Sequence, residues 1–482
     1  MHVVVLGAGL AGLAAAWELA RAGVEVDVVE REGEVGGMAA SWQVDGHWLD
    51  HGPHRFHTRD PELLAHVREV LGEELELRRR RSRIRLRGRW FDYPLRAGNV
   101  LANLPPWLLA RALWDYGAAR LSERLHPTPD AHFEAWVVKR FGRTLYELFF
   151  GTYTAKAWRM PCDQISADWA SQRISQANLG DAIRRTLFPA RDEAPRGLVS
   201  QFHYPRSGGI GSIARRYAEG VRAAGGRIHL GESLESVDVE GGRARRVRTH
   251  GARGTRTLAC DALVNTIPWT TLLARLRFAD AAGLDAEVRA AMQGLATIGI
   301  VFVYLEVARE RVMPDHWVYL PEADLTVHRV SEFRNFCAGA SPAGRTALCC
   351  EITCRPGDER WGLDLEAAAA IARADLLRVG LLAPGEGRAL DLRRLAQAYP
   401  VYDLDYRERV QALRRATRAV TNLVTTGRQG LFRYNNMDHS IAMGRKAAHG
   451  LLVAREIERV GAPAPAPARA HETVGAGAEY YG

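Results

Sequence analysis

Residues 7–12, with the sequence Gly-Ala-Gly-Leu-Ala-Gly, have the spacing of a phosphate-binding turn. Gly7 permits a tight turn, Gly9 lets a pyrophosphate approach the backbone, and Gly12 lets the following helix pack closely on a sheet. The N-terminus of that helix adds N–H donors and a partial positive charge. The segment therefore predicts a site for the diphosphate of a dinucleotide.

Glu30 ends the second predicted strand, at the distance where a carboxylate accepts hydrogen bonds from both ribose hydroxyls. Because this carboxylate would repel a 2′-phosphate, an adenosine with a free ribose is predicted. Arg31 follows, and the doublet Gly36-Gly37 precedes Met38. The doublet resembles the second motif of flavoproteins related to glutathione reductase and amine oxidases. There it brings the backbone against the extended dinucleotide, so the resemblance implies FAD rather than NAD.

Two later segments complete the predicted FAD site. Gly427-Arg428 follows a predicted strand, and Asn436-Met437 precedes a predicted helix at 440–460, whose N-terminal N–H groups could face flavin oxygens. A simple loop and helix cap is the alternative interpretation. In this class of flavoproteins a middle strand offers backbone groups to adenine, and that position falls here at Val237.

The elements that must position these residues alternate as strand, helix and strand over residues 3–6, 11–22 and 24–30. The predicted fold class is α/β, with a Rossmann-like FAD-binding domain, a helical insertion domain and a β-sheet domain that covers the substrate. The assigned ranges are 1–60, 196–275 and 415–460 for the FAD-binding domain, 61–195 for the mainly helical substrate domain and 276–414 for the β-rich substrate domain. Residues 461–482 are rich in Ala, Pro and Gly and are predicted to form a disordered tail.

The composition indicates an ordinary globular enzyme of 482 residues, with 47% hydrophobic and 25% charged residues. The net charge of +9 comes almost wholly from arginine, and without stacking aromatics or a known module we expect no nucleic-acid partner. No apolar run approaches the roughly 20 residues of a membrane span, and no secretory signal is recognised, so we expect no membrane and a cytoplasmic location. The six cysteines indicate buried thiols, and no metal site is expected.

Several separated motifs resemble, in the same order, those of the UDP-galactopyranose mutase family. They are residues 50–58 (DHGPHRFHT), 151–158 (GTYTAKAW), 208–209 (GG), 328–333 (HRVSEF), 397–401 (QAYPV) and 433–437 (RYNNM). The resemblance implies that N5 of the reduced flavin attacks the anomeric carbon of a nucleotide sugar and expels the diphosphate. The resulting adduct opens and recloses through another hydroxyl. The flavin is then the nucleophile, and no catalytic triad is needed.

The resemblance also assigns roles to side chains. It gives catalytic roles to His54, beside the flavin, and to Arg329, as the diphosphate contact. The substrate-binding residues that it implies are Tyr153, Trp158, Arg329, Tyr399 and Tyr434. Guanidinium and phenol groups suit diphosphate oxygens because they donate strong, directed hydrogen bonds. The expected partners are a small-molecule substrate, namely a nucleotide sugar, and an electron donor such as NAD(P)H. A homo-oligomer is left open.

Two departures from the family pattern weaken the substrate assignment. A second phosphate-binding arginine of the family falls on Ala177, and Asn436 replaces an acidic residue. Residues 91–94 and 165–169 also resemble both mutase-like and protoporphyrinogen-oxidase-like proteins. The alternative is therefore an FAD-dependent oxidoreductase of the protoporphyrinogen oxidase, amine oxidase or desaturase type, which takes hydride from its substrate.

Overall fold

The computed structural model describes residues 1–95, 97–174, 200–279 and 283–460. A five-stranded parallel sheet has the order β20-β13-β1-β2-β9. Its strands are β1 (His2–Leu6), β2 (Glu25–Glu30), β9 (Arg227–Leu230), β13 (Ala262–Asn265) and β20 (Leu423–Thr425). The strands are short and mostly apolar because helices and the rest of the molecule bury them. This sheet confirms the predicted α/β fold.

Three helices accompany this sheet: α1 (Leu10–Arg21), α10 (Ser212–Ala223) and α16 (Met437–Val460). Helix α1 is rich in Ala and Leu, and most of its residues are buried. Helices α1 and α16 pack so closely that a Cβ atom added to Gly444 would lie 2.1 Å from the Ala11 carbonyl oxygen. The predicted C-terminal helix therefore exists, and it begins at Met437 rather than at residue 440.

A second sheet, antiparallel except for one pair, has the order β12-β11-β10-β14. It consists of β10 (Glu232–Glu240), β11 (Arg243–Gly251), β12 (Gly254–Ala259) and β14 (Leu276–Phe278). Its apolar side chains pack against the face of the parallel sheet that carries Val4 and Leu6, and the two sets form one buried core.

A seven-stranded sheet has the order β19-β15-β18-β17-β16-β6-β7. Its strands are β6 (Ser82–Leu86), β7 (Arg89–Asp92), β15 (Thr297–Val307), β16 (Trp317–Tyr319), β17 (Arg329–Glu332), β18 (Thr346–Cys354) and β19 (Arg388–Pro400). Helix α13 (Leu365–Arg378) packs its buried side chains into the same core as β15 and β18. The mainly helical block expected from residue 61 is thus interrupted by strands, because Ile84, Leu86 and Phe91 alternate with arginines and pair with the sheet.

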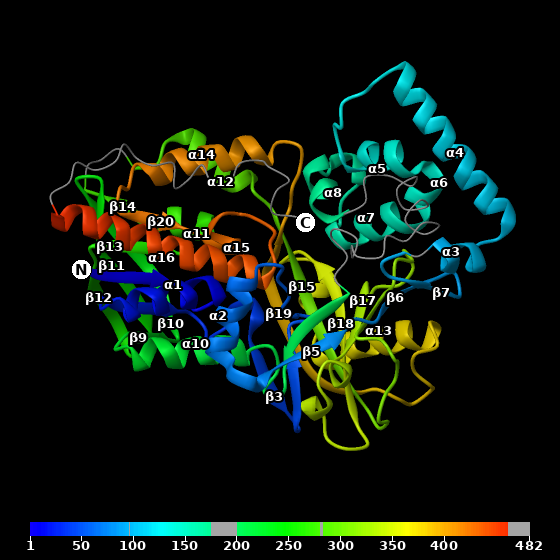
Figure 1. Ribbon diagram of the computed structural model, residues 1–482, viewed down its shortest axis with the longest axis horizontal. Coiled ribbons are helices and arrows are strands. Elements are labelled where there is room, and N and C mark those ends of the chain that lie inside the picture. Colours follow the sequence, from blue (N-terminus) through cyan, green and yellow to red (C-terminus); the bar gives the residue numbers. More distant parts are fainter. Residues whose placement is uncertain (96, 175–199, 280–282, 461–482) are drawn as a thin grey trace.

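A cluster of helices lies at the upper right of Figure 1, beside the seven-stranded sheet. It consists of α3 (Ala97–Asn103), α4 (Pro106–Leu125), α5 (Phe133–Phe141), α6 (Arg143–Leu145), α7 (Thr152–Trp158) and α8 (Ala167–Arg173). Aromatic side chains form much of its core, including Phe133, Trp136, Trp158 and Trp169. This core also reaches α11 (Trp269–Leu273), α12 (Ala286–Gly294) and α14 (Tyr406–Arg418).

Smaller elements connect these bodies. They are α2 (Pro61–Leu71), α15 (Gly427–Gly430) and the two-stranded sheets β3 (Ser41–Val44) with β4 (His47–Asp50) and β5 (Leu75–Arg79) with β8 (Gln201–Pro205). Among the described helices, none is both long and apolar enough to cross a bilayer. The predicted tail at 461–482 and the position Ala177 lie outside the described residues.

Candidate active site

The glycine turn between β1 and α1 has a backbone geometry that excludes larger residues. The Gly7 N–H donates to the Val29 carbonyl over 2.8 Å, and Gly7 has a φ angle of +98°. A Cβ atom on Gly12 would lie 2.0 Å from the Gly7 carbonyl oxygen. Both glycines are therefore required for the turn itself, before any ligand binds.

Gly9 differs from its two neighbours in the motif. A Cβ atom added there meets no heavy atom within 4 Å. Gly36 donates its N–H to the Ala8 carbonyl over 2.8 Å, and Gly37 approaches so closely that its added Cβ would lie 3.5 Å from the Gly9 Cα. The predicted doublet thus lies against the turn and leaves open space at Gly9, where a pyrophosphate would fit.

The Glu30 carboxylate lies at the end of β2 beside this turn. It accepts hydrogen bonds from the backbone N–H groups of Ala8, at 2.8 Å, and Glu32, at 3.0 Å. Each oxygen keeps a further lone pair for a ribose hydroxyl. Arg31 instead pairs with Glu32, and its side chain is 76% exposed, so nothing in the structure brings it into the site.

Val237 lies within β10, a strand that has a neighbouring strand on both edges. Strand β10 pairs with β11 on one side and β14 on the other at this residue, and the Val237 N–H donates to the Arg275 carbonyl over 2.9 Å. This N–H is therefore already used within the sheet, and the adenine contact expected at Val237 stays a prediction. The register of β10 and β11 shifts between Leu234 and Ser236, so the interruption of the ladder lies nearer Glu235.

The segment that follows β20, in the C-terminal part of the chain, reaches the same glycine turn. Gly427, with a φ angle of +77°, lies so close to α1 that an added Cβ would be 2.8 Å from the Ala11 Cβ. Arg428 lies 3.7 Å from the Met38 sulfur, which joins this return to the glycine doublet. Asn436 is exposed and Met437 opens α16. The amino end of a long helix is therefore available to favour negative charge.

Arg329 forms a buried bidentate ion pair that the sequence motifs did not indicate. Its Nε and one terminal nitrogen donate to the two Glu351 oxygens, each over 2.6 Å, and the Glu351 side chain is fully buried. Burial lowers the pKa of the Arg329 guanidinium, but Glu351 outweighs this effect and holds the pKa well above its usual value. The arginine is thus permanently charged and fixed in direction.

Tyrosine side chains and a second arginine surround Arg329. Its guanidinium lies 3.4 Å from the Tyr399 hydroxyl, and Arg428 lies over the rings of Tyr399 and Tyr434 at 5.1 Å and 4.4 Å. Burial raises the pKa of Tyr399, so its hydroxyl remains a hydrogen-bond donor. Nearby Tyr153 has its pKa raised well above the usual value by burial, while Arg329 opposes that shift. We call Tyr153, Tyr399 and Tyr434, with Arg329 and Arg428, the tyrosine wall.

Trp158 supports this wall from behind. The indole is 6% exposed and makes edge contacts with Trp169 and Tyr399, at ring-centre distances of 4.5 Å and 5.5 Å. Trp158 therefore packs in the aromatic core, where it orients Tyr399. Tyr153 makes an edge contact with Tyr319 at 5.3 Å.

His54 lies in the loop after β4, near the two guanidinium groups of the tyrosine wall. Burial lowers the pKa of its imidazole to about 3, with further contributions from His51, Arg428 and Arg329. Its buried Nδ1 has no hydrogen-bond partner among the described residues. His54 is therefore a neutral group near Arg428 and Arg329, and its Nδ1 is left to interact with a ligand.

Asp50 lies immediately before this loop, and the sequence motifs assign it no role. Its buried carboxyl accepts hydrogen bonds from Ser41 Oγ at 2.5 Å and Tyr204 Oη at 2.6 Å. Burial raises its pKa to about 6. A Cβ atom on Gly209 would lie 2.7 Å from Asp50 Oδ1, which explains the glycine pair before α10. Asp50 thus fixes the start of the loop after β4, which carries His54.

Comparisons with known proteins agree with this geometry. The model of the family described as flavin containing amine oxidoreductase matches residues 10–448. Phytoene dehydrogenase of Streptomyces griseus is 28% identical over 285 residues, or 55% of this chain and 54% of that protein. A probable UDP-galactopyranose mutase of Klebsiella pneumoniae is 26% identical over 34% of this chain and 43% of that protein. The chain thus spans about half the length of these curated relatives.

Solved structures show the same fold over nearly the whole chain. Reduced UDP-galactopyranose mutase superposes with a TM-score of 0.81 and 22% identity, covering 98% of this chain and 97% of that one. A putative protoporphyrinogen oxidase from Exiguobacterium sp. 255-15 gives a TM-score of 0.69 and 18% identity, covering 94% and 99%. The protein belongs to the flavin-containing amine oxidoreductase family, and its cofactor is FAD.

Proposed function

We propose that this flavoenzyme is a redox-neutral mutase that rearranges a nucleotide-linked or related sugar, with the flavin in its reduced form. The observation that carries the proposal is the polar character of the tyrosine wall. Arg329 contacts the Tyr399 hydroxyl, and Arg428 lies over both Tyr399 and Tyr434. Two permanent cations and several neutral hydroxyl donors suit an anionic substrate better than an apolar one.

The residues that would hold FAD are those of the glycine turn. Gly9 leaves room for the pyrophosphate, Glu30 would accept the ribose hydroxyls, and the start of α16 would face the flavin. When bound and reduced, FAD would supply the nucleophilic atom N5. The resemblance to UDP-galactopyranose mutase and the TM-score of 0.81 support this assignment of chemistry.

The tyrosine wall would bind and orient the leaving group. A diphosphate leaves as a stable anion, so it needs charge stabilisation more than a proton donor. Glu351 occupies two of the Arg329 nitrogens, and Nη1 has no hydrogen-bond partner among the described residues. This nitrogen, with the Tyr399 and Tyr153 hydroxyls, would donate to phosphate oxygens. Neutral His54 would contribute a nitrogen without adding a competing charge.

The test is turnover of nucleotide sugars by enzyme in its two redox states. Purified protein is incubated anaerobically, oxidised or reduced with dithionite, with UDP-, dTDP- and GDP-linked hexoses, and products are separated by anion-exchange chromatography. We expect an isomeric nucleotide sugar only with reduced enzyme, and borohydride should trap a covalent flavin–sugar species. Equal turnover by oxidised enzyme would contradict the proposal.

A second candidate is an oxidoreductase that takes hydride from its substrate. The similarity to Streptomyces griseus phytoene dehydrogenase favours it, and so does the 23% identity to coproporphyrinogen III oxidase of Propionibacterium freudenreichii subsp. freudenreichii over 85% of this chain. It predicts that substrate bleaches the oxidised flavin anaerobically. The Arg428 guanidinium near His54 counts against it for an apolar substrate, because Arg428 has no carboxylate partner among the described residues and burying an unpaired charge against hydrocarbon is costly.

A further inference from the structure

Helix α4 carries an unusual concentration of exposed apolar side chains. Of the twelve large hydrophobic residues that are exposed in the described chain, six lie in α3 and α4. They are Leu101, Trp107, Leu113, Trp114, Leu121 and Leu125, and Trp114 is 77% exposed. Monomeric soluble proteins rarely present such a group on one element without a binding role.

The spacing places these side chains on one side of α4. Trp107, Trp114 and Leu121 recur at intervals of seven residues, which keeps them in line at about 100° per residue. The opposite side is anchored: Leu108 and Ala112 are buried, and Asp115 accepts hydrogen bonds from the Thr144 N–H and hydroxyl. We call the outward side, with Trp107, Leu113, Trp114, Leu121 and Leu125, the apolar face of α4.

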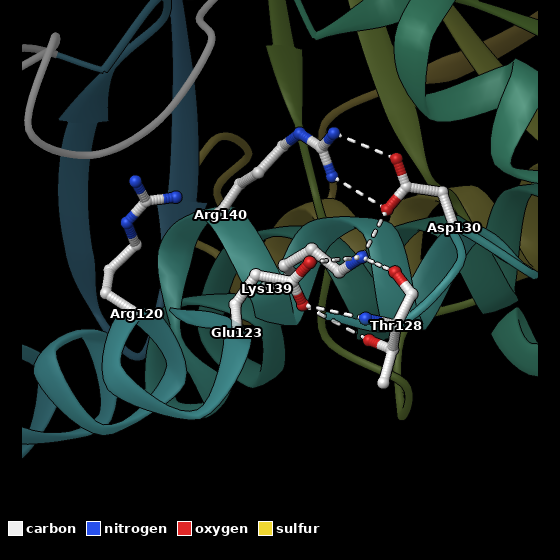
Figure 2. A pocket seen from close by; sticks show the side chains of 6 residues that line it. All are labelled: Arg120, Glu123, Thr128, Asp130, Lys139 and Arg140. Atoms are coloured by element: carbon white, nitrogen blue, oxygen red, sulfur yellow. Dashed lines mark hydrogen bonds and ion pairs between the residues drawn. The ribbon is translucent and has the colours of Figure 1, made fainter. Parts of the chain in front are cut away.

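Arginines flank this face without acidic partners. Arg111 lies four residues after Trp107, and Arg120 and Arg124 lie seven and eleven residues after Leu113. None of the three has a carboxylate partner among the described residues. Figure 2 shows the contrast: Arg140 and Lys139 are paired with Asp130, and Glu123 is paired with Lys139, whereas Arg120 stands apart. The two acidic residues of α4, Asp115 and Glu123, thus bind groups on its buried side and not the three arginines.

We propose that the apolar face of α4 lies in the interfacial layer of a membrane that contains anionic phospholipids. Tryptophan and leucine side chains would enter the boundary between headgroups and acyl chains, and the flanking arginines would contact phosphates. This binding goes beyond the proposed function and differs from the sequence-based expectation that no membrane takes part. It needs no membrane-spanning helix.

Charge complementarity favours a lipid surface over a second copy of the chain. In a two-fold contact the same surface meets itself, so Arg111, Arg120 and Arg124 of both copies would be brought into one interface. Asp115 and Glu123 could not compensate, because they already bind Thr144, Lys139 and Thr128. An anionic membrane provides both the apolar layer and the phosphates that this helix lacks.

The test is sedimentation of purified, flavin-loaded full chain with vesicles. One set contains phosphatidylcholine alone, and the other contains phosphatidylcholine mixed with phosphatidylglycerol. We expect binding to the mixed vesicles that weakens with salt, together with a blue shift of tryptophan fluorescence. The double variant Trp114→Ser/Leu121→Ser should bind at least about tenfold more weakly. The double variant Arg120→Gln/Arg124→Gln should lose about fivefold for each arginine removed.

Matched controls carry the same changes elsewhere on the surface. Leu377→Ser/Leu404→Ser removes two other exposed leucines, and Arg253→Gln/Arg277→Gln removes two other exposed arginines. Both should bind vesicles like the wild type. Absence of binding to mixed vesicles would overturn the proposal. A lipid-free dimer that Trp114→Ser/Leu121→Ser dissociates would assign the face to a second copy and overturn it as well.

Discussion

The glycine turn and the tyrosine wall are held in place by different kinds of interaction within one site. In the turn, backbone atoms meet backbone atoms at contact distance, as at Gly12 and Gly7, and charge plays little part. In the wall, long side chains from separate strands and helices are held by ion pairing and ring contacts, as between Arg329 and Glu351. A change in the turn should therefore impair folding or cofactor binding, whereas a change in the wall should alter the charge balance and the affinity for the substrate.

The largest expected effect is in the turn. Gly12→Val should destabilise the protein by about 5 kcal/mol or abolish soluble expression, because its Cβ would overlap the Gly7 carbonyl oxygen. Gly9→Ala is the matched change, since an added Cβ there meets open space. It should alter the free energy of unfolding of the apoprotein by less than about 0.5 kcal/mol and still weaken FAD binding. Chemical denaturation of the apoprotein measures the free energy of unfolding, and flavin titration measures FAD binding. Equal destabilisation by both variants would contradict the difference in packing between Gly12 and Gly9.

The next effect is in the wall, where Glu351→Gln leaves Arg329 buried without its carboxylate. We expect a loss of about 3 kcal/mol in the free energy of unfolding. Added phosphate should raise the melting temperature of this variant more than that of the wild type, because an anion can replace the missing charge. The double variant Arg329→Gln/Glu351→Gln provides the control and should recover part of the stability. A single variant as stable as the wild type would show that the ion pair is not required.

Asp50, immediately before the loop that carries His54, should give a pH-dependent effect. Burial raises its pKa in the folded protein to about 6, above the ordinary value of 3.8, so the folded state retains a proton that the unfolded state releases. The wild type should therefore lose stability relative to Asp50→Asn as pH rises from about 4 to about 6, by up to about 3 kcal/mol. Below about pH 3 the carboxyl is protonated in both states and this contribution is flat. Chemical denaturation across this range measures the difference; a pH-independent difference would contradict the assignment.

The smallest effect concerns single hydroxyls of the wall. Tyr399→Phe removes a donor beside Arg329 and keeps the ring, so kcat/KM for the substrate should fall about tenfold while flavin content stays unchanged. Tyr217→Phe is the control, because the Tyr217 hydroxyl is buried without a partner among the described residues. Steady-state kinetics of both variants checks the prediction, and a similar loss in Tyr217→Phe would mean that the effect is structural.

The glycine turn could be predicted from the sequence almost completely, because its partners are close in the chain and glycine positions report backbone contacts directly. The wall could be predicted only in part. Tyr399 and Arg329 stand in recognisable motifs, but Glu351 is one acidic residue within an otherwise apolar strand, and only the pairing of β17 with β18 brings it opposite Arg329. At Val237, the alternating strand pattern does not reveal that β10 has a neighbouring strand on both edges.

The most direct measurement of the proposed chemistry is positional isotope exchange in a nucleotide sugar labelled with heavy oxygen at the bond between the anomeric carbon and the diphosphate. Reduced wild-type enzyme should scramble the label into the non-bridging phosphate positions, because that bond breaks and re-forms without net oxidation. Oxidised enzyme should leave the label in place. A label that stays fixed with reduced enzyme while the same sugar is converted to product would contradict cleavage at this bond and the proposed mutase with it.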